Sequence, residues 1–313
     1  MNAAVIGCGN WGKNHARVYR ILEEVHLDAV IDVDEARARD VGECYGARWS
    51  TDIGMVLEDD EIDIVSVCTS TDSHYSVALS LMESDKHVIV EKPPAETVEE
   101  AQNLIRYAQN RGVHLSVGFL ERFNPCVIEA INQVSKGSIG AIILAHSRRI
   151  SRKPARFGDI DVIKDLAIHD IDLLSLIFQG EPEYVFSRCG SLDGRYEDYA
   201  NIIISYGRNE TAFVEANWHT PRKIRELVIT GTRGQIRAMY QDQELVLEDE
   251  KGCHTISPGY REPLFEELRS FARSVMLDIS PVITGIDGLK ALRICEAALQ
   301  SSATGMPSRI MGG

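Results

Sequence analysis

The fold of this chain is decided near its start, by residues 3–12, which read AAVIGCGNWG. An apolar run is followed by three glycines in a G-x-G-x-x-G spacing and then by an amphipathic segment, which predicts a strand, a tight turn and a helix. Gly7 permits the tight turn, Gly9 lets the backbone approach a pyrophosphate, and Gly12 allows close packing of helix against strand. The helix N-terminus offers unpaired N–H groups to phosphates, so this stretch predicts a dinucleotide-binding turn.

The pattern around this turn continues to residue 118, because short apolar runs alternate with amphipathic stretches as in the βα units of a parallel sheet. The expected strands are 3–6, 27–31, 63–68, 87–90 and 113–117. The expected helices are 15–24, 35–45, 73–84 and 98–111, the last closed by Gly112 as a C-cap. The chain is therefore predicted to be α/β, with an N-terminal Rossmann domain over residues 1–120.

A second domain, predicted over residues 121–313, has a different pattern. Asn124 and Pro125 predict the N-cap and first turn of a helix that ends near Gly137. Strand-like segments with alternating polarity follow at 139–149, 183–191, 199–206, 211–219, 224–230 and 234–240, and helical patterns lie at 165–178, 264–275 and 288–301. This domain is expected to be α+β with a largely antiparallel sheet.

Composition excludes several classes of function. A net charge of −14 over 313 residues argues against a nucleic-acid surface. No apolar run approaches the roughly 20 residues that span a bilayer, and no signal peptide precedes the first strand, so we expect a cytoplasmic protein. The seven cysteines are scattered without a C-x-x-C pair, which predicts reduced thiols and no metal site.

The choice of dinucleotide depends on Asp32, which closes the second expected strand about 20 residues after Gly12. A carboxylate there can accept hydrogen bonds from both ribose hydroxyls and would repel a 2′-phosphate, so NAD is favoured over NADP. Arg37 and Arg39 lie close enough in sequence to leave NADP open. The remaining expected cofactor contacts are Asn10, Trp11, Thr69, Thr71, His74, Glu91 and Lys92.

Three further residues carry the chemistry of a dehydrogenase. Hydride removal from an alcohol carbon requires the hydroxyl proton to leave as well, so a base is needed near that oxygen. Lys92 follows an apolar strand at the carboxyl edge of the parallel sheet, where open α/β folds bind ligands. Asp165 and His169 are four residues apart on a helical pattern, so both project from one face. Singly, each has an ordinary interpretation: a solvated lysine, a helix cap and a buried histidine.

Together these motifs resemble the Gfo/Idh/MocA oxidoreductase family. The resemblance rests on the glycine turn, on Glu91-Lys92-Pro93 and on the D-x-x-x-H pair, in a matching order and spacing across nearly the whole chain. It implies a C-terminal domain with a large open sheet, whose exposed face pairs subunits into homodimers or homotetramers. It also implies that Lys92 and His169 contact the reacting hydroxyl, with His169 favoured as the base, and that Asp165 orients a sugar.

Within the family, residues 118–125 and 165–172 are most similar to enzymes acting on nucleotide sugars, notably UDP-N-acetylglucosamine 3-dehydrogenases. This similarity suggests a purpose for a basic segment at 148–156, since guanidinium groups bind diphosphates well. The residues expected to bind substrate are Arg122, Asn124, Arg148, Arg152 and Arg156. The leading hypothesis is oxidation at C3 of a UDP-N-acetyl amino sugar. The alternatives are a free-sugar or inositol-type dehydrogenase and a nucleotide-binding regulator without chemistry.

Overall fold

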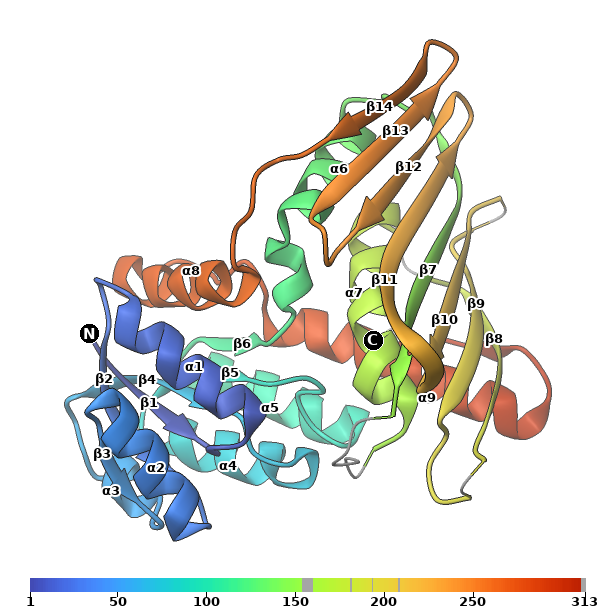
Figure 1. The fold of residues 1–313 in the computed structure, drawn as a ribbon. Coiled ribbons are helices and arrows are strands. Elements are labelled where there is room, and N and C mark those ends of the chain that lie inside the picture. The colour runs from blue at the N-terminus through green and yellow to red at the C-terminus, as the bar shows by residue number, and fades with distance from the viewer. Residues whose placement is uncertain (154–159, 181, 193, 208, 311–313) are drawn as a thin grey trace. The chain divides into compact units, whose positions relative to one another are not determined.

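The computed structural model describes residues 1–153, 160–180, 182–192, 194–207 and 209–310 (Figure 1). The chain divides into two compact units. The first comprises Met1–Phe119 and Leu264–Leu289, all of them described, and the second comprises Leu120–Pro263 and Lys290–Gly313. Within the described ranges, none of the helices has the length and hydrophobicity that a membrane-spanning segment requires.

The first unit is a doubly wound α/β domain. Its strands are β1 (Asn2–Ile6), β2 (His26–Ile31), β3 (Arg48–Ser50), β4 (Ile62–Val67), β5 (His87–Val90) and β6 (Leu115–Val117), and its helices are α1 (Asn10–Ile21), α2 (Glu35–Tyr45), α3 (Gly54–Leu57), α4 (Thr71–Glu83), α5 (Val98–Arg111) and α8 (Pro263–Leu277). The six strands are parallel in the order β3-β2-β1-β4-β5-β6. The order reverses between β1 and β4, which is where such sheets bind dinucleotides.

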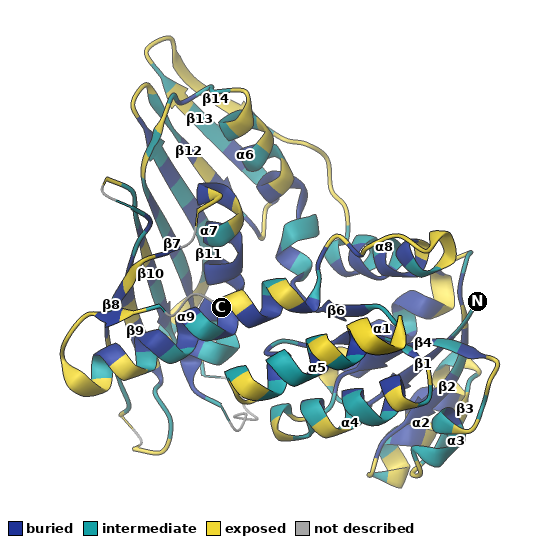
Figure 2. Cartoon of the chain, turned by 180° about the vertical axis from the view of Figure 1, so that it is seen from behind, coloured by how far each residue is buried: buried dark blue, intermediate teal, exposed yellow. Residues whose placement is uncertain are grey.

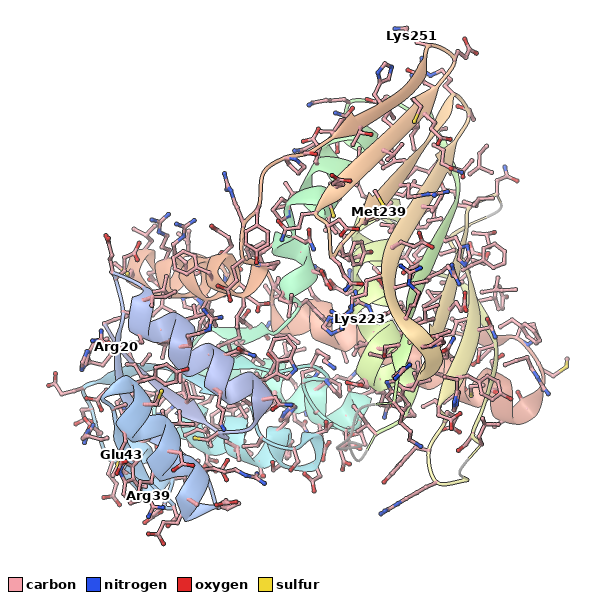
Figure 3. All side chains as sticks on the ribbon, viewed as in Figure 1. Arg20, Arg39, Glu43, Lys223, Met239 and Lys251 are labelled. Carbon is pink, nitrogen blue, oxygen red and sulfur yellow. The ribbon has the colours of Figure 1, made fainter. Side chains whose placement is uncertain are left out.

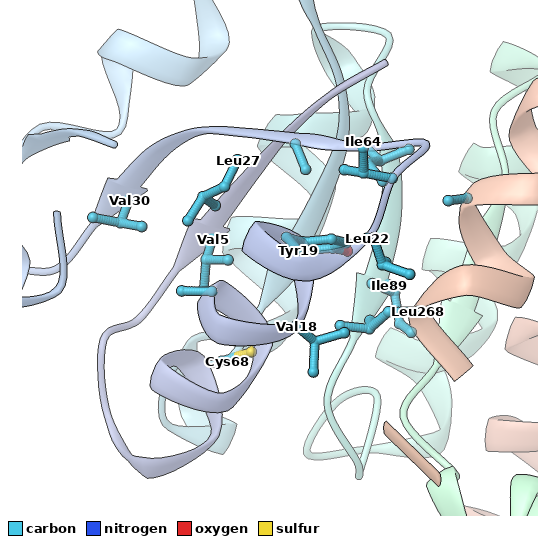
Figure 4. Packing of buried hydrophobic residues seen from close by; sticks show 14 of the residues in the cluster. Val5, Val18, Tyr19, Leu22, Leu27, Val30, Ile64, Cys68, Ile89 and Leu268 are labelled. Carbon is cyan, nitrogen blue, oxygen red and sulfur yellow. The ribbon is translucent and has the colours of Figure 1, made fainter. Parts of the chain in front are cut away.

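Helix α8 joins the first unit although it lies far along the sequence. Its residues Leu264, Leu268, Phe271 and Ala272 belong to the buried cluster that also contains Val18 of α1 (Figure 4). The units of the structure therefore differ from the expected division at residue 120 in one respect: residues 264–289 return to the N-terminal unit. The physical reason is the apolar face of α8, which is buried against α1.

The second unit is built on a mixed, mostly antiparallel sheet. Its strands are β7 (Ile142–Arg152), β8 (Tyr184–Gly190), β9 (Tyr199–Ser205), β10 (Thr211–Asn217), β11 (His219–Gly231), β12 (Gly234–Met239), β13 (Glu244–Asp249), β14 (Gly252–Ile256) and β15 (Ser308–Arg309). Among the described residues these nine strands lie in the order β14-β13-β12-β11-β7-β10-β9-β8-β15, with β7 and β10 parallel. Buried and more exposed residues alternate along several strands (Figure 2). The helices are α6 (Pro125–Ser135), α7 (Ile168–Phe178) and α9 (Gly285–Thr304), which crosses the boundary between units.

Most predicted elements are confirmed within a few residues. Helix α5 has the expected bounds with Gly112 as a left-handed C-cap, and Asn124 caps α6 through its side chain. Helix α1 begins at Asn10, directly after the glycine turn as expected, but ends at Ile21, before the end of the helical pattern at 15–24. Strand β11 begins at His219 because an irregular stretch extends its pairing with β7. Helix α3 and strands β3, β13, β14 and β15 were not predicted. Of these, α3, β3 and β15 have four residues or fewer, and β14 lacks a run of apolar residues.

Candidate active site

The glycine turn between β1 and α1 has the geometry that its spacing predicts. Gly7 has φ +93°, a left-handed conformation that favours glycine. A Cβ on Gly12 would lie 1.7 Å from the carbonyl oxygen of Gly7, so only glycine lets the helix pack this closely. A Cβ on Gly9 would meet no atom within 4 Å. The fold itself therefore does not require glycine at position 9, which fits a role in admitting the pyrophosphate of a dinucleotide.

Asp32 lies at the end of β2, beside this turn, and its carboxylate is held by backbone amides. Oδ2 accepts a hydrogen bond from Cys8 N at 2.7 Å, and Oδ1 accepts one from Asp34 N at 2.8 Å. Burial, followed by the charge of Asp32, raises the pKa of the Cys8 thiol to about 12. The guanidinium of Arg37 lies 3.2 Å from Asp34, whereas Arg39 is exposed. A fixed carboxylate at this position fits the two ribose hydroxyls of NAD.

His74 connects the ends of two strands of the sheet. Its Nδ1 lies 2.8 Å from the carbonyl oxygen of Pro93, after β5, and its Nε2 lies 3.2 Å from that of Thr69, after β4. The ring is almost fully buried, and burial lowers its pKa. His74 thus holds together the turns that carry Thr69 and Lys92, two of the residues predicted to contact the cofactor, while Thr71 begins α4.

A buried hydrogen-bonded network lies next to Lys92. Glu91 Oε1 is 3.0 Å from Nε2 of His15, whose Nδ1 is 2.9 Å from the hydroxyl of Ser66. The same hydroxyl is 2.8 Å from that of Tyr19. Tyr19 lies among the buried residues of the first unit (Figure 4), and burial raises its pKa. His15 was not predicted, although its position four residues before Tyr19 on the buried face of α1 could have indicated it.

In the second unit, Asp165 and His169 lie on either side of a change in helical geometry. Residues Ile163–Ala167 form a π-helical turn, and His169 is the second residue of α7. Asp161 precedes this turn and caps it, since its Oδ1 accepts hydrogen bonds from the amides of Ile163 and Lys164, each at 2.9 Å. Wide helical turns of this kind occur frequently at functional sites. Asp165 is partly exposed and His169 is buried.

A charged cluster lies beneath α7. Arg149 is 1% exposed, and its guanidinium binds Asp170 through Nε at 2.7 Å and Nη2 at 3.3 Å. It also donates to Glu121 Oε1 at 3.1 Å and lies over the ring of Tyr240, whose hydroxyl is 3.3 Å from Asp170. Sequence reasoning did not single out Arg149, because only the register of β7 shows that it faces inward.

Two of the residues predicted to bind substrate, Arg122 and Asn124, make contacts within the protein. Arg122 makes a two-point contact with Asp172, with Nε and Nη2 at 2.7 and 2.5 Å from the carboxylate oxygens. Asn124 caps α6 and donates from Nδ2 to Glu121 and to the carbonyl of Tyr240, which gives it a structural role.

The predicted basic segment is divided between the two faces of the sheet. Arg148 contacts Glu215 and Glu226 at 2.8 and 3.2 Å, on the face opposite Arg149. Arg152 is exposed, and Arg156 lies outside the described residues. Among the residues that the structure describes, no group of three or more His, Cys, Asp or Glu side chains is placed to hold a metal ion.

Comparison with known proteins gives this arrangement a family. Residues 1–119 match the model of the oxidoreductase family with an NAD-binding Rossmann fold, Gfo/Idh/MocA, and residues 127–237 match the C-terminal domain of the same family. The scyllo-inositol 2-dehydrogenase (NAD(+)) of Bacillus subtilis is 30% identical over 99% of this chain and 96% of its own length.

A second relative acts on a nucleotide sugar. The UDP-N-acetylglucosamine 3-dehydrogenase of Acidithiobacillus ferrooxidans is 35% identical over 58% of this chain and 56% of its own length. A solved structure of that enzyme is 27% identical, covers 97% of each chain and has a TM-score of 0.87. The chain belongs to the Gfo/Idh/MocA oxidoreductase family, as an NAD-binding enzyme among dehydrogenases that act on sugars and polyols.

Proposed function

We propose that this enzyme oxidises the C3 hydroxyl of a UDP-linked N-acetyl amino sugar. The observation that carries the reaction type is the Asp165–His169 pair on the π turn and the start of α7, in a chain that also has the glycine turn and Lys92. The relative that acts on UDP-N-acetylglucosamine supports the choice of substrate. When bound at the glycine turn, NAD supplies the hydride acceptor.

Each of the three residues has one role in this proposal. His169 accepts the proton of the reacting hydroxyl, so that the carbon losing its hydride becomes a carbonyl. Lys92 donates a hydrogen bond to the same oxygen and stabilises the negative charge that develops there. Asp165 accepts a hydrogen bond from a neighbouring sugar hydroxyl and so orients the ring. The His15–Glu91 contact holds the backbone just before Lys92.

A second candidate is the oxidation of a free polyol such as inositol. Two observations favour it: the Bacillus subtilis inositol enzyme is similar over almost the whole chain, and Arg148 is already neutralised by two glutamates. In that case the basic segment would have no ligand. A regulator without chemistry has less support, because the family consists of oxidoreductases.

We also propose that the chain forms a homodimer or homotetramer through the sheet face opposite α7. Apolar side chains are exposed there: Ile143, Ile203 and Phe213 are 42%, 38% and 40% accessible. Phe213 lies opposite Ile203 on β9 and His146 on β7, so the patch is continuous across strands. Light scattering after size exclusion should give a multiple of the 34.8 kDa chain mass, and Phe213→Lys should lower it. A monomeric wild type would contradict this.

The test of the function is NAD reduction by purified protein with UDP-N-acetylglucosamine, free N-acetylglucosamine, glucose or myo-inositol. We expect NADH with the nucleotide sugar alone, a product lighter by two hydrogen atoms, and a new carbonyl carbon at C3 in the NMR spectrum. Lys92→Ala is the control and should produce no NADH. Turnover of myo-inositol alone would contradict the proposed substrate and support the oxidation of a free polyol instead.

A further inference from the structure

Two arginines of the second unit face each other directly across neighbouring strands. Arg225 of β11 is the register partner of Arg149 of β7, and both belong to the buried charged cluster. Like charges in directly opposite positions of a sheet repel each other and destabilise the pairing. The neighbouring pair, Glu226 opposite Arg148, has complementary charges instead. The Arg149–Arg225 pair therefore depends on negative charge from elsewhere.

The carboxylates of the cluster favour Arg149 over Arg225. Asp170 binds Arg149 at two points, and Glu121 Oε1 lies 3.1 Å from Arg149 but 3.6 Å from Arg225. The second oxygen of Glu121 is taken by the side chain of Asn124 at 3.1 Å. Within the described part of the chain, the only carboxylate oxygen within ion-pair distance of Arg225 is therefore Glu121 Oε1, which lies closer to Arg149.

Lys223 adds a third cation on the same side of the sheet. It lies two residues from Arg225 on β11, so the two side chains share a face. Figure 3 shows Lys223 on the side of the sheet where α7 lies. Among the described residues, no carboxylate lies within ion-pair distance of Lys223. Its charged neighbours are Arg225, Arg149 and Glu121.

The cations of the cluster are therefore unequally paired. Arg149 binds both Asp170 and Glu121, Arg225 has one longer contact with Glu121, and no ion pair of Lys223 lies among the described residues. Burial and the charge of Arg149 lower the pKa of Arg225, and burial and the charge of Arg225 lower that of Lys223. Asp165, one of the proposed reaction residues, lies close enough to Arg225 to raise the pKa of its guanidinium. The weakly paired Arg225 is therefore near one of the proposed reaction residues.

We propose that Arg225 and Lys223 form a binding subsite for an anionic group of the substrate. The group is a phosphate of the diphosphate if the substrate is a nucleotide sugar, because a guanidinium and an ammonium on one strand face match phosphate oxygens. The identity of the group rests on the proposed function, whereas the presence of an anion subsite rests on the opposed Arg149–Arg225 pair and on the weak pairing of Arg225 and Lys223. In this proposal Arg225 and Lys223 take the role that the sequence suggested for Arg148, because Arg148 is already paired with two glutamates on the opposite face of the sheet.

The binding test uses UDP as the probe, measured by calorimetry in the presence of saturating NAD so that the nucleotide site of the first unit is filled. The variants are Lys223→Gln and Arg225→Gln, with Arg222→Gln as a matched control, since this exposed neighbour loses the same charge from the adjacent strand position. We expect the dissociation constant of UDP to rise roughly 10- to 100-fold in the first two variants, as for a lost charged hydrogen bond, and to stay within about twofold in the control. Thermal melting of each variant establishes that it is folded.

Steady-state kinetics separate this inference from the proposed function. If the wild type oxidises UDP-N-acetylglucosamine, KM should rise in Lys223→Gln and Arg225→Gln with a smaller change in kcat, and an unchanged KM and UDP affinity would overturn the subsite alone. If the wild type oxidises only myo-inositol, the proposed function fails. The subsite then stands if UDP binds the wild type and is lost in both variants, and it is overturned if UDP does not bind.

Discussion

Each unit of this enzyme contains a polar network, and the two networks differ in how completely their members are paired. In the first unit, His15 and Glu91 form one pair, and the hydroxyls of Ser66 and Tyr19 extend it. In the second, the buried Arg149 binds both Asp170 and Glu121, whereas Arg225 has one longer contact with Glu121 and Lys223 is exposed.

The difference suggests what each network does. A closed network in which each polar group has a partner stabilises backbone positions, here the turn that ends in Lys92, and needs nothing from outside. A network with a weakly paired, largely buried cation gains a partner when a ligand of opposite charge binds. We therefore interpret the first network as a support for the cofactor side of the enzyme and the second as a preformed place for an anionic substrate group.

The largest expected effect is on Arg149. Arg149→Met should lower the free energy of unfolding by about 3–5 kcal/mol, because it leaves the buried carboxylates of Asp170 and Glu121 without their main partner. Arg225→Met should change it by less than about 1 kcal/mol, since Arg225 is poorly paired. Urea denaturation measures both. Equal decreases in the free energy of unfolding in the two variants would show that Arg225 is as well paired as Arg149.

The next largest effects are expected at two glycines of the cofactor turn. Substitutions there distinguish a glycine that the fold requires from one that a ligand requires. Gly12→Ala should destabilise the protein by about 3 kcal/mol, because the new methyl would meet the carbonyl of Gly7. Gly9→Ala should leave thermal stability unchanged and weaken NAD binding about tenfold, since only a ligand occupies that space. Melting curves with and without NAD measure both effects. Undiminished NAD affinity in Gly9→Ala would contradict the assigned role.

A smaller effect is expected in the network of the first unit. Glu91→Gln should reduce the free energy of unfolding by about 1–2 kcal/mol, because a charge-assisted hydrogen bond to His15 becomes a neutral one. The same variant should lower kcat, since the backbone before Lys92 is held less firmly, while the dissociation constant of UDP stays at its wild-type value. Denaturation, kinetics and calorimetry on one preparation give the three values. A change in UDP affinity would mean that the networks are not independent.

The smallest effect concerns cofactor choice. Wild-type enzyme should use NAD with a kcat/KM about tenfold or more above that for NADP, because the Asp32 carboxylate repels a 2′-phosphate. Asp32→Ala should weaken NAD binding and lower the ratio of kcat/KM with NAD to kcat/KM with NADP. Arg37 and Arg39 are near enough in sequence to pair with the 2′-phosphate of NADP. Initial rates with both cofactors measure it. A wild type that prefers NADP would contradict the role of Asp32.

The sequence predicted local elements better than contacts between distant segments, for a physical reason. Turn, strand and helix signals within residues 3–12 are local, as are the caps Gly112 and Asn124. The return of α8 to the first unit depends on contacts between residues some 250 positions apart, such as Arg273 with Glu24 at a separation of 249. No local pattern reports such a contact.

The same limit applies to the candidate site. Lys92, Asp165 and His169 could be proposed from the sequence because their motifs have recognisable spacing. His15 was missed because its partner Glu91 is 76 residues away. The basic segment at 148–156 was treated as one surface because the strand register was unknown. Adjacent arginines of a strand point to opposite faces, so Arg148 and Arg149 enter different environments.

The decisive measurement is hydrogen transfer from UDP-N-acetylglucosamine carrying deuterium at C3, with NAD as acceptor and the product NADH examined by mass spectrometry. We predict NADH that contains the deuterium, a rate lowered by the heavier isotope if hydride transfer limits turnover, and no NADH from Lys92→Ala. NADH without deuterium, or NADH formed from labelled myo-inositol but not from the nucleotide sugar, would contradict oxidation at C3 of a UDP sugar.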